Sequence, residues 1–180
     1  MKATGIVRRI DDLGRVVIPK EIRRTMRIRE GDPLEIYTDS DGEVIFKKYS
    51  PLGELGNFSV QYADVLYKSG GYPVVVCDRD HVIAVSGVPK KELLERRVSS
   101  SLEDCMEQRK TFAFAGGDSA KVQPVEGDDR YAIAGAPIIS AGDVCGSIMF
   151  VSDAPNSQAG ETEIKLIATA AAFLGKQMEE

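Results

Sequence analysis

The 180-residue sequence has a single histidine, His81, and only three cysteines: Cys77, Cys105 and Cys145. The cysteines lack the paired spacing of a zinc site, and their odd number is typical of a reducing compartment. His81 lies in a predicted turn, where neither a metal ligand nor a member of a catalytic triad is expected. The sequence therefore predicts no metal, no other cofactor and no catalytic residues.

Long apolar runs are also missing. No stretch approaches the roughly 20 apolar residues that a membrane span needs, and the first residues lead into a strand pattern rather than a signal peptide. Gly116-Gly117-Asp118 lacks the Lys-Ser/Thr pair of a phosphate-binding loop. With 43% hydrophobic and 28% charged residues, the composition is that of a soluble globular protein. We expect a cytoplasmic protein without a membrane partner.

Positive charge is concentrated at one end of a chain whose net charge is -5. Residues 1–29 hold nine lysines or arginines and three acids, a net charge of +6. Residues 30–48 carry a net charge of -4, and residues 49–180 a net charge of -7. A basic first segment followed by an acidic remainder predicts that the first segment contacts a polyanion.

The first fifty residues read as four short strands and one helix. We predict strands over Gly5–Ile10, Arg15–Ile18, Leu34–Thr38 and Glu43–Lys47, with turns at 11–14 and 39–42. Pro19 is predicted to open the helix as its first residue. So small a unit, with no disulfide or metal, rarely buries enough apolar surface alone. We therefore expect it to be an obligate dimer.

The helix that follows Pro19 is predicted to have two contrasting faces. Four cations share one face at helical spacing: Lys20, Arg23, Arg24 and Arg27. Ile18, Ile22 and Met26 lie on the opposite face. A face that served only solubility would normally include glutamates, so the bias indicates polyanion binding. Three more arginines, Arg8, Arg9 and Arg15, extend the positive charge onto the preceding segment, and the guanidinium fork suits phosphate oxygens and the guanine edge.

Residues 51–180 read as a separate α/β domain. Ser50-Pro51 is predicted to cap and open a helix, and apolar residues at helical spacing, among them Val65 and Leu66, run on to Gly70-Gly71. Strands are predicted over 74–77, 82–85, 131–139 and 144–151, and short helices over 90–96 and 101–109. The closing helix, 161–178, has two apolar stripes, so we expect it to pack on its own sheet and on a partner subunit.

One segment resembles a known family. The run Lys2–Arg24, with Gly-Arg-Val-Val-Ile-Pro at 14–19 and Glu-Ile-Arg-Arg at 21–24, is similar to the DNA-binding segment of the AbrB-type transition-state regulators. The similarity continues through 31–36 and 44–49. It implies a swapped-hairpin β-barrel dimer that binds double-stranded DNA sequence-specifically. It also places five basic residues at the family's DNA-facing positions: Arg8, Arg9, Arg15, Arg23 and Arg24. Lys20 is often apolar in the family, so its assignment depends on the helix face alone.

The rest of the chain resembles a GAF-type sensor domain more weakly. Together the two resemblances imply an α+β two-domain protein, with a swapped-hairpin DNA-binding domain at 1–50 and a GAF-like domain with flanking helices at 51–180. They imply an activator and repressor of sporulation genes in a spore-forming bacterium, acting on the nucleoid of the forespore. They also imply a homotetramer in which GAF-like helices join head dimers, and they leave open a small-molecule effector. The operator sequence, the effector and the sign of regulation stay open.

Two other functions are compatible with parts of the sequence. Antitoxins use the same swapped-hairpin head, but their tails are typically short and disordered until a toxin binds. Here about 125 residues with clear periodicity follow the head, which argues against an antitoxin. Some GAF-fold enzymes reduce methionine sulfoxide with cysteines, but no cysteine-rich loop or supporting base is evident here. We therefore do not expect an enzyme.

Overall fold

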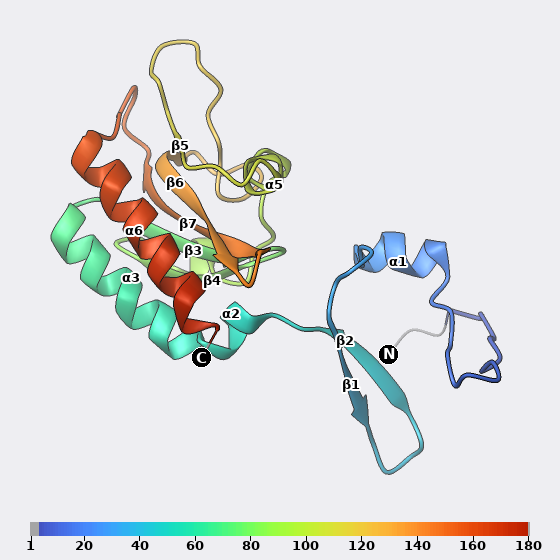
Figure 1. The fold of residues 1–180 in the computed structure, drawn as a ribbon. Helices are drawn as coiled ribbons and strands as arrows, with labels where there is room; N and C mark the ends of the chain where they lie inside the picture. Colours follow the sequence, from blue (N-terminus) through green and yellow to red (C-terminus); the bar gives the residue numbers. More distant parts are fainter. Residues whose placement is uncertain (1–3, 180) are drawn as a thin grey trace. The chain divides into compact units, whose positions relative to one another are not determined.

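The computed structural model describes residues 4–179 and divides into two compact units, Met1–Tyr49 and Ser50–Glu180 (Figure 1). We refer to them as the head and the C-terminal unit. No helix in the described part of the chain is both long and apolar enough to cross a membrane.

The head contains one helix and one two-stranded sheet. α1 spans Lys20–Met26, β1 spans Leu34–Thr38 and β2 spans Val44–Lys48. The strands pair antiparallel, which confirms the predicted hairpin. In its turn, the Asp39 carboxylate accepts hydrogen bonds from the amides of Asp41 and Glu43, and Gly42 supplies the left-handed residue with φ +83°.

The two N-terminal strands that we predicted, over Gly5–Ile10 and Arg15–Ile18, are wrong for the single chain. Neither segment forms a strand, and the described head contains no closed barrel. A strand needs a neighbour for its backbone N–H and C=O groups. The only sheet of the described head is the β1–β2 hairpin, and neither segment pairs with it.

The helix prediction is right in place but wrong at both ends. Pro19 is the N-cap of α1 rather than its first residue, and Arg27 lies beyond the helix in the left-handed region, with φ 49°. The amides of Arg27 and Ile28 bond back to the carbonyls of Arg24 and Arg23, which is how a helix ends at a left-handed residue. The predicted four-cation face therefore loses Arg27.

The C-terminal unit is an antiparallel sheet between helices. It begins with α2 (Pro51–Glu54) and α3 (Gly56–Gly70), and its later helices are α4 (Lys90–Leu93), α5 (Ser100–Glu107) and α6 (Glu161–Gln177). The sheet has the order β4-β3-β7-β6-β5, with every pair antiparallel. Its strands are β3 (Val74–Asp78), β4 (Val82–Ser86), β5 (Phe112–Ala113), β6 (Tyr131–Ser140) and β7 (Asp143–Ser152). This mixed α/β arrangement is the one predicted, apart from the unpredicted β5.

Two predictions in this unit need correction. The helix expected over 90–96 stops at Leu93, because Glu95 turns left-handed (φ 63°) and its amide bonds to the Val82 carbonyl. In α3, Val65 is 57% exposed although we placed it on the apolar stripe. The buried face of this helix is formed instead by Ser59, Ala63 and Leu66.

The sheet carries a core on each face. Side chains alternate along a strand, so Val74 and Val76 pack with α3 and α6, while Val75 and Cys77 belong to the cluster of α4 and α5. β7 alternates in the same way. In Figure 1, α3 and α6 lie side by side over one face of the sheet. This unit therefore buries most of its apolar residues within a single chain.

The junction after the head is fixed to the C-terminal unit. As predicted, Ser50 caps a helix: its hydroxyl accepts from the Gly53 amide at 3.2 Å. The same hydroxyl donates to the Asp78 carboxylate at 3.0 Å, and Leu52 is fully buried. Ser50 and Leu52 thus anchor the start of the C-terminal unit, directly after the last residue of the head.

Candidate nucleic-acid interface

All five predicted arginines are exposed on the head. Arg23 and Arg24 lie in the last turn of α1, where the negative end of the helix dipole favours cations, and Glu21 lies in its first turn. Arg8 and Arg9 precede the 11–15 turn, and Arg15 closes it. The basic residues thus belong to two local elements, α1 and this turn.

Asp11 organises the turn that presents Arg15. Its Oδ1 accepts hydrogen bonds from the amides of Leu13 (3.0 Å) and Arg15 (2.8 Å), and Gly14 is left-handed with φ +77°. Its Oδ2 accepts a hydrogen bond from Nε of Arg15 at 2.7 Å. The Arg15 amide, followed by the Arg15 guanidinium, holds the pKa of the Asp11 carboxyl below its usual range. From the sequence we predicted only a turn here. The sequence feature that could have indicated the ion pair is an acidic residue four positions before an arginine.

Lys48 ties the hairpin to the end of α1. Its Nζ donates to the Arg27 carbonyl at 2.9 Å and lies 3.9 Å from Oδ2 of Asp32. The same Asp32 oxygen accepts from the Arg29 amide at 2.8 Å. A cation at a helix C-terminus is favourable, so these contacts hold α1 against β2. This role of Lys48 could not be predicted from the sequence, because Lys48 and the Arg27 carbonyl lie about twenty residues apart in the chain.

The head has almost no interior of its own. Of its described residues only Pro19 is buried. Val7, Ile10 and Val17, from the two segments predicted as strands, are 88%, 72% and 70% exposed. Met26, on the face of α1 opposite the arginines, is also exposed. So much exposed apolar surface marks an interaction site on the head.

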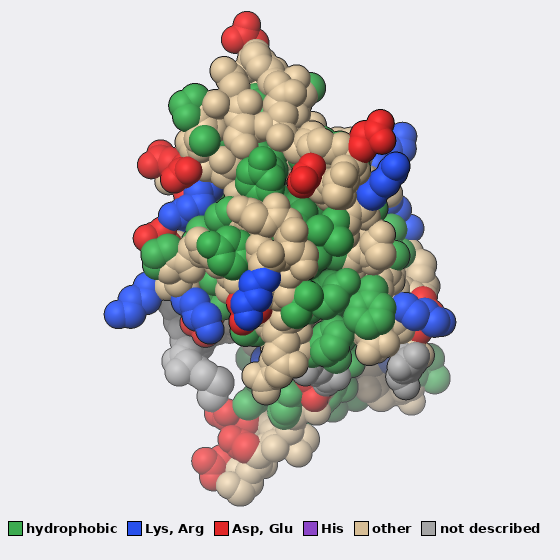
Figure 2. All heavy atoms as spheres, turned by 90° about the vertical axis from the view of Figure 1, so that its left-hand side faces the viewer, with side chains coloured by type: hydrophobic (Ala, Val, Ile, Leu, Met, Phe, Trp, Pro, Cys, Tyr) green, Lys and Arg blue, Asp and Glu red, His purple; other side chains and the backbone are tan. Residues whose placement is uncertain are grey.

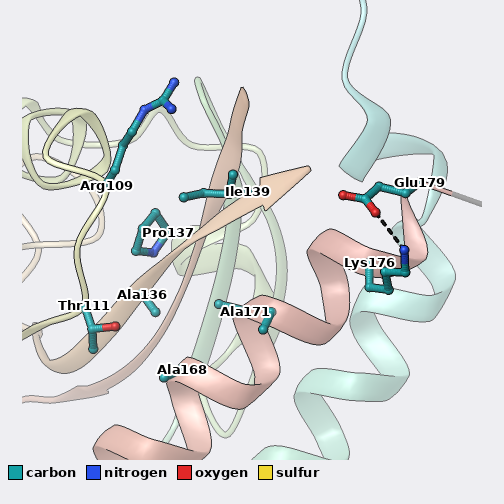
Figure 3. Close-up of a pocket in the computed structure, with 10 residues that line it drawn as sticks. Arg109, Thr111, Ala136, Pro137, Ile139, Ala168, Ala171, Lys176 and Glu179 are labelled. Carbon is teal, nitrogen blue, oxygen red and sulfur yellow. Dashed lines mark hydrogen bonds and ion pairs between the residues drawn. The ribbon is translucent and has the colours of Figure 1, made fainter. Parts of the chain in front are cut away.

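The C-terminal unit contains a pocket of about 360 Å³ between β6, α6 and the segment after α5 (Figure 3). Small side chains such as Ala136 and Ala171 form its floor, while Arg109 lies at one end and the Lys176–Glu179 pair at the other. The Arg109 guanidinium donates to the Gly142 carbonyl at 2.8 Å. The charged residues at its two ends would suit this pocket to a small ligand that carries charge.

Glu179 connects that pocket to the β6–β7 turn. It accepts a hydrogen bond from the Ala141 amide at 3.1 Å and pairs with Lys176 at 2.9 Å. Lys176, together with that amide, keeps the pKa of the Glu179 carboxyl below its usual range. Both charged ends of the pocket are therefore attached to the same turn.

The cysteines are poorly suited to catalysis. Burial raises the pKa of Cys77, Cys105 and Cys145 above that of an ordinary thiol. The thiolate is the reactive form, so each is a weak nucleophile at neutral pH. In the described part of the chain, no three His, Cys, Asp or Glu side chains are grouped so as to hold a metal ion.

Two family models match the chain. Residues 54–179 match "Stage V sporulation protein T C-terminal, transcription factor". Residues 7–53 match "Antidote-toxin recognition MazE, bacterial antitoxin". The first match covers most of the C-terminal unit, and the second covers the described arginines of the head.

Known relatives agree with this division. The chain is 55% identical over 182 residues to stage V sporulation protein T of Bacillus subtilis, covering 100% of both chains. It is 48% identical over 84 residues to the transition state regulatory protein AbrB of the same organism, covering 42% of this chain and 86% of that one. The GAF domain of a phosphoenolpyruvate-protein phosphotransferase from Coxiella burnetii covers 69% of this chain and 82% of its own, with a TM-score of 0.54 and 17% identity. The last similarity shows the fold alone: the C-terminal unit is GAF-like.

Proposed function

Because the chain belongs to the stage V sporulation protein T family of transcription factors, we propose that it is a sequence-specific DNA-binding regulator of sporulation genes. It acts as activator and repressor in the cytoplasm of a spore-forming bacterium, on the nucleoid of the forespore. The observation that carries DNA binding is the head itself: residues 1–29 have a net charge of +6, and their described arginines are exposed. Multiple exposed cations on one small unit suit the phosphate backbone.

Five residues form the proposed contact surface. Arg23 and Arg24 are exposed in the last turn of α1, and Arg15 is presented by the Asp11 turn. Arg8 and Arg9 add charge beside that turn. We take residues 1–50 as the DNA-binding domain and residues 51–180 as the GAF-like regulatory domain, in keeping with the two compact units.

The head is proposed to dimerise through the segments on either side of the 11–15 turn. Their exposed apolar side chains, including Val7 and Val17, have no cover within the head. Strand exchange with a second copy would give these segments backbone partners and complete the barrel that AbrB-type heads form. The charge needed for DNA would then be presented twice, in a symmetric pair of heads.

The second interface is proposed on the outer face of α3 and α6. Phe58, Tyr62 and Phe173 cluster there, with ring centroids 5.4–6.0 Å apart. Phe173 and Val65 stay exposed, and Figure 2 shows hydrophobic side chains gathered on the side of the molecule that these helices cover. Pairing of this face would join two head dimers into a homotetramer.

A small molecule is proposed to regulate the assembly through the pocket beside α6. The combination of an alanine floor with Arg109 at one end and Lys176–Glu179 at the other favours a charged metabolite. The alternatives have less support. An antitoxin does not explain a GAF-like unit after the head, and the raised cysteine pKa values disfavour a sulfoxide reductase. We propose that the protein acts without catalysis.

Removing the arginine pair of α1 tests DNA binding. The full-length Arg23→Ala, Arg24→Ala variant should lose at least about 30-fold in affinity for its preferred duplex, since each good arginine–base contact contributes about 1–3 kcal/mol. Fluorescence anisotropy at fixed salt would measure it, with the duplex selected by the wild-type chain from a random library. The matched control is Lys90→Ala, Lys91→Ala, which removes two exposed cations from α4. Equal losses in both variants, or none in either, would contradict the proposed surface.

A further inference from the structure

The two turns of the head have the same construction. In each, an aspartate carboxylate accepts from the amides two and four residues later: Asp11 from Leu13 and Arg15, and Asp39 from Asp41 and Glu43. Each turn has a left-handed glycine in its fourth position and closes with backbone hydrogen bonds between its first and last residues. The turn therefore forms whether a cation or an acid follows it.

Only the first turn adds an ion pair to this design. Oδ2 of Asp11, which the turn does not use, accepts from Nε of Arg15 at 2.7 Å. The corresponding position of the second turn is Glu43, whose carboxylate side chain cannot donate to Asp39. The Asp11–Arg15 pair is thus an addition to a turn that needs only Oδ1 and the backbone.

The pair sets the direction in which the Arg15 guanidinium points. The Arg15 side chain is 70% exposed, and its terminal nitrogens, Nη1 and Nη2, make no hydrogen bond in the described part of the chain. A carboxylate that occupies Nε leaves the end of the fork available, and that end matches O6 and N7 of guanine. The same carboxylate repels phosphate oxygens, so it disfavours the sequence-independent contact that a free arginine would make.

We propose that Asp11 is a positioning residue for sequence recognition: it holds Arg15 for a base edge, a guanine in the simplest case, and reduces its binding to the phosphate backbone. This inference rests on the proposed DNA-binding function. Asp11 itself does not touch the base. It acts by limiting the directions in which the Arg15 guanidinium can point and by repelling the phosphate oxygens that this guanidinium would otherwise bind.

The test uses three full-length variants that each remove one negative charge from the head. Asp11→Asn keeps Oδ1 as an acceptor for the turn but weakens the contact with Arg15. Asp39→Asn makes the same change in the turn that lacks the arginine. Asp12→Asn removes a neighbouring charge whose carboxylate has no hydrogen bond in the described part of the chain. Anisotropy titrations would compare the duplex selected by the wild-type chain with a scrambled duplex of equal composition.

We expect Asp11→Asn to lower the ratio of selected to scrambled affinity by about tenfold, within the range for one bidentate base contact. Its affinity for scrambled DNA should stay level or rise. Asp12→Asn and Asp39→Asn should shift both affinities together and leave the ratio unchanged. In an Arg15→Ala background, Asp11→Asn should no longer change the ratio, because the two residues act through one contact.

Three results separate the inference from the function on which it rests. If wild-type protein shows no preference for any duplex, the proposed function fails. If the wild type discriminates but Asp11→Asn keeps the full ratio, or lowers it equally without Arg15, the positioning role alone is overturned. If Asp12→Asn or Asp39→Asn lowers the ratio as much as Asp11→Asn, general charge or turn structure accounts for the effect, which also overturns it. Circular dichroism of each variant checks that the turn substitution has not unfolded the head.

Discussion

The two units use apolar residues in opposite ways. In the C-terminal unit they lie on both faces of a five-stranded sheet, and Phe150, Met149 and Leu174 are fully buried. In the described head only Pro19 is buried, while the side chains of Val7 and Val17 are exposed to solvent. The sequence patterns are equally strand-like in both. The difference shows that a strand pattern forms a strand only where a pairing partner is available, and the single chain offers none to residues 5–10 and 15–18 of the head.

Breaking the C-terminal core should have the largest effect. Phe150 is fully buried, its ring is tilted by 55° against that of Tyr72 with the centroids 6.1 Å apart, and it lies so close to Gly70 that a Cβ there would overlap its ring. Phe150→Ala should lower the free energy of unfolding of this unit by about 3–5 kcal/mol, because it removes a large side chain and leaves a cavity. Urea unfolding followed by far-UV circular dichroism would measure it. A loss below about 1 kcal/mol would mean that this core is not closed within the chain.

A charge in the head should act on assembly rather than on a folded monomer. Val17→Asp is harmless if Val17 stays 70% exposed, as it is in the single chain. If the segment pairs with a second copy, burial of the carboxylate should weaken head dimerisation by at least about 30-fold, or about 2 kcal/mol. Sedimentation of residues 1–52 carrying the substitution gives the dimer dissociation constant. Ser40→Asp in the exposed 39–42 turn adds the same single negative charge and provides the control.

The junction should show the smallest effect. Ser50→Ala removes a helix cap and the hydrogen bond to Asp78. The C-terminal unit should lose about 1 kcal/mol, the usual contribution of a cap. Residues 1–52 with the same substitution should dimerise as before. Thermal unfolding of residues 1–52 and of residues 50–180, each with and without the substitution, would measure the two effects. A destabilised head would show that Ser50 belongs to the head's fold.

Much of the fold followed from sequence pattern, because most elements of the C-terminal unit pair or pack within the chain. The strands on either side of residues 140–143, the hairpin at 39–42 and the closing helix are all present. β5 was missed because two residues carry no periodicity. The pattern also could not show that Arg27 turns left-handed at the end of α1, since that depends on how the helix ends rather than on spacing.

The candidate site was only partly predictable. Charge density and helical spacing identified the arginines, since these depend on residue type and position alone. The ion pair between Asp11 and Arg15 depends on a turn conformation that leaves Oδ2 free, and the contact of Lys48 with α1 depends on tertiary placement. The pocket beside α6 was not foreseen at all, because its alanines resemble ordinary helix surface in the sequence.

The most direct test of the contrast between the units is the self-association of residues 1–52. Sedimentation equilibrium, combined with thermal unfolding at several protein concentrations, would report whether the head folds alone. We predict a dimer whose unfolding midpoint rises with concentration, because folding and association are the same event when the apolar surface is covered only by a second copy. A folded monomer whose midpoint does not depend on concentration would contradict the account.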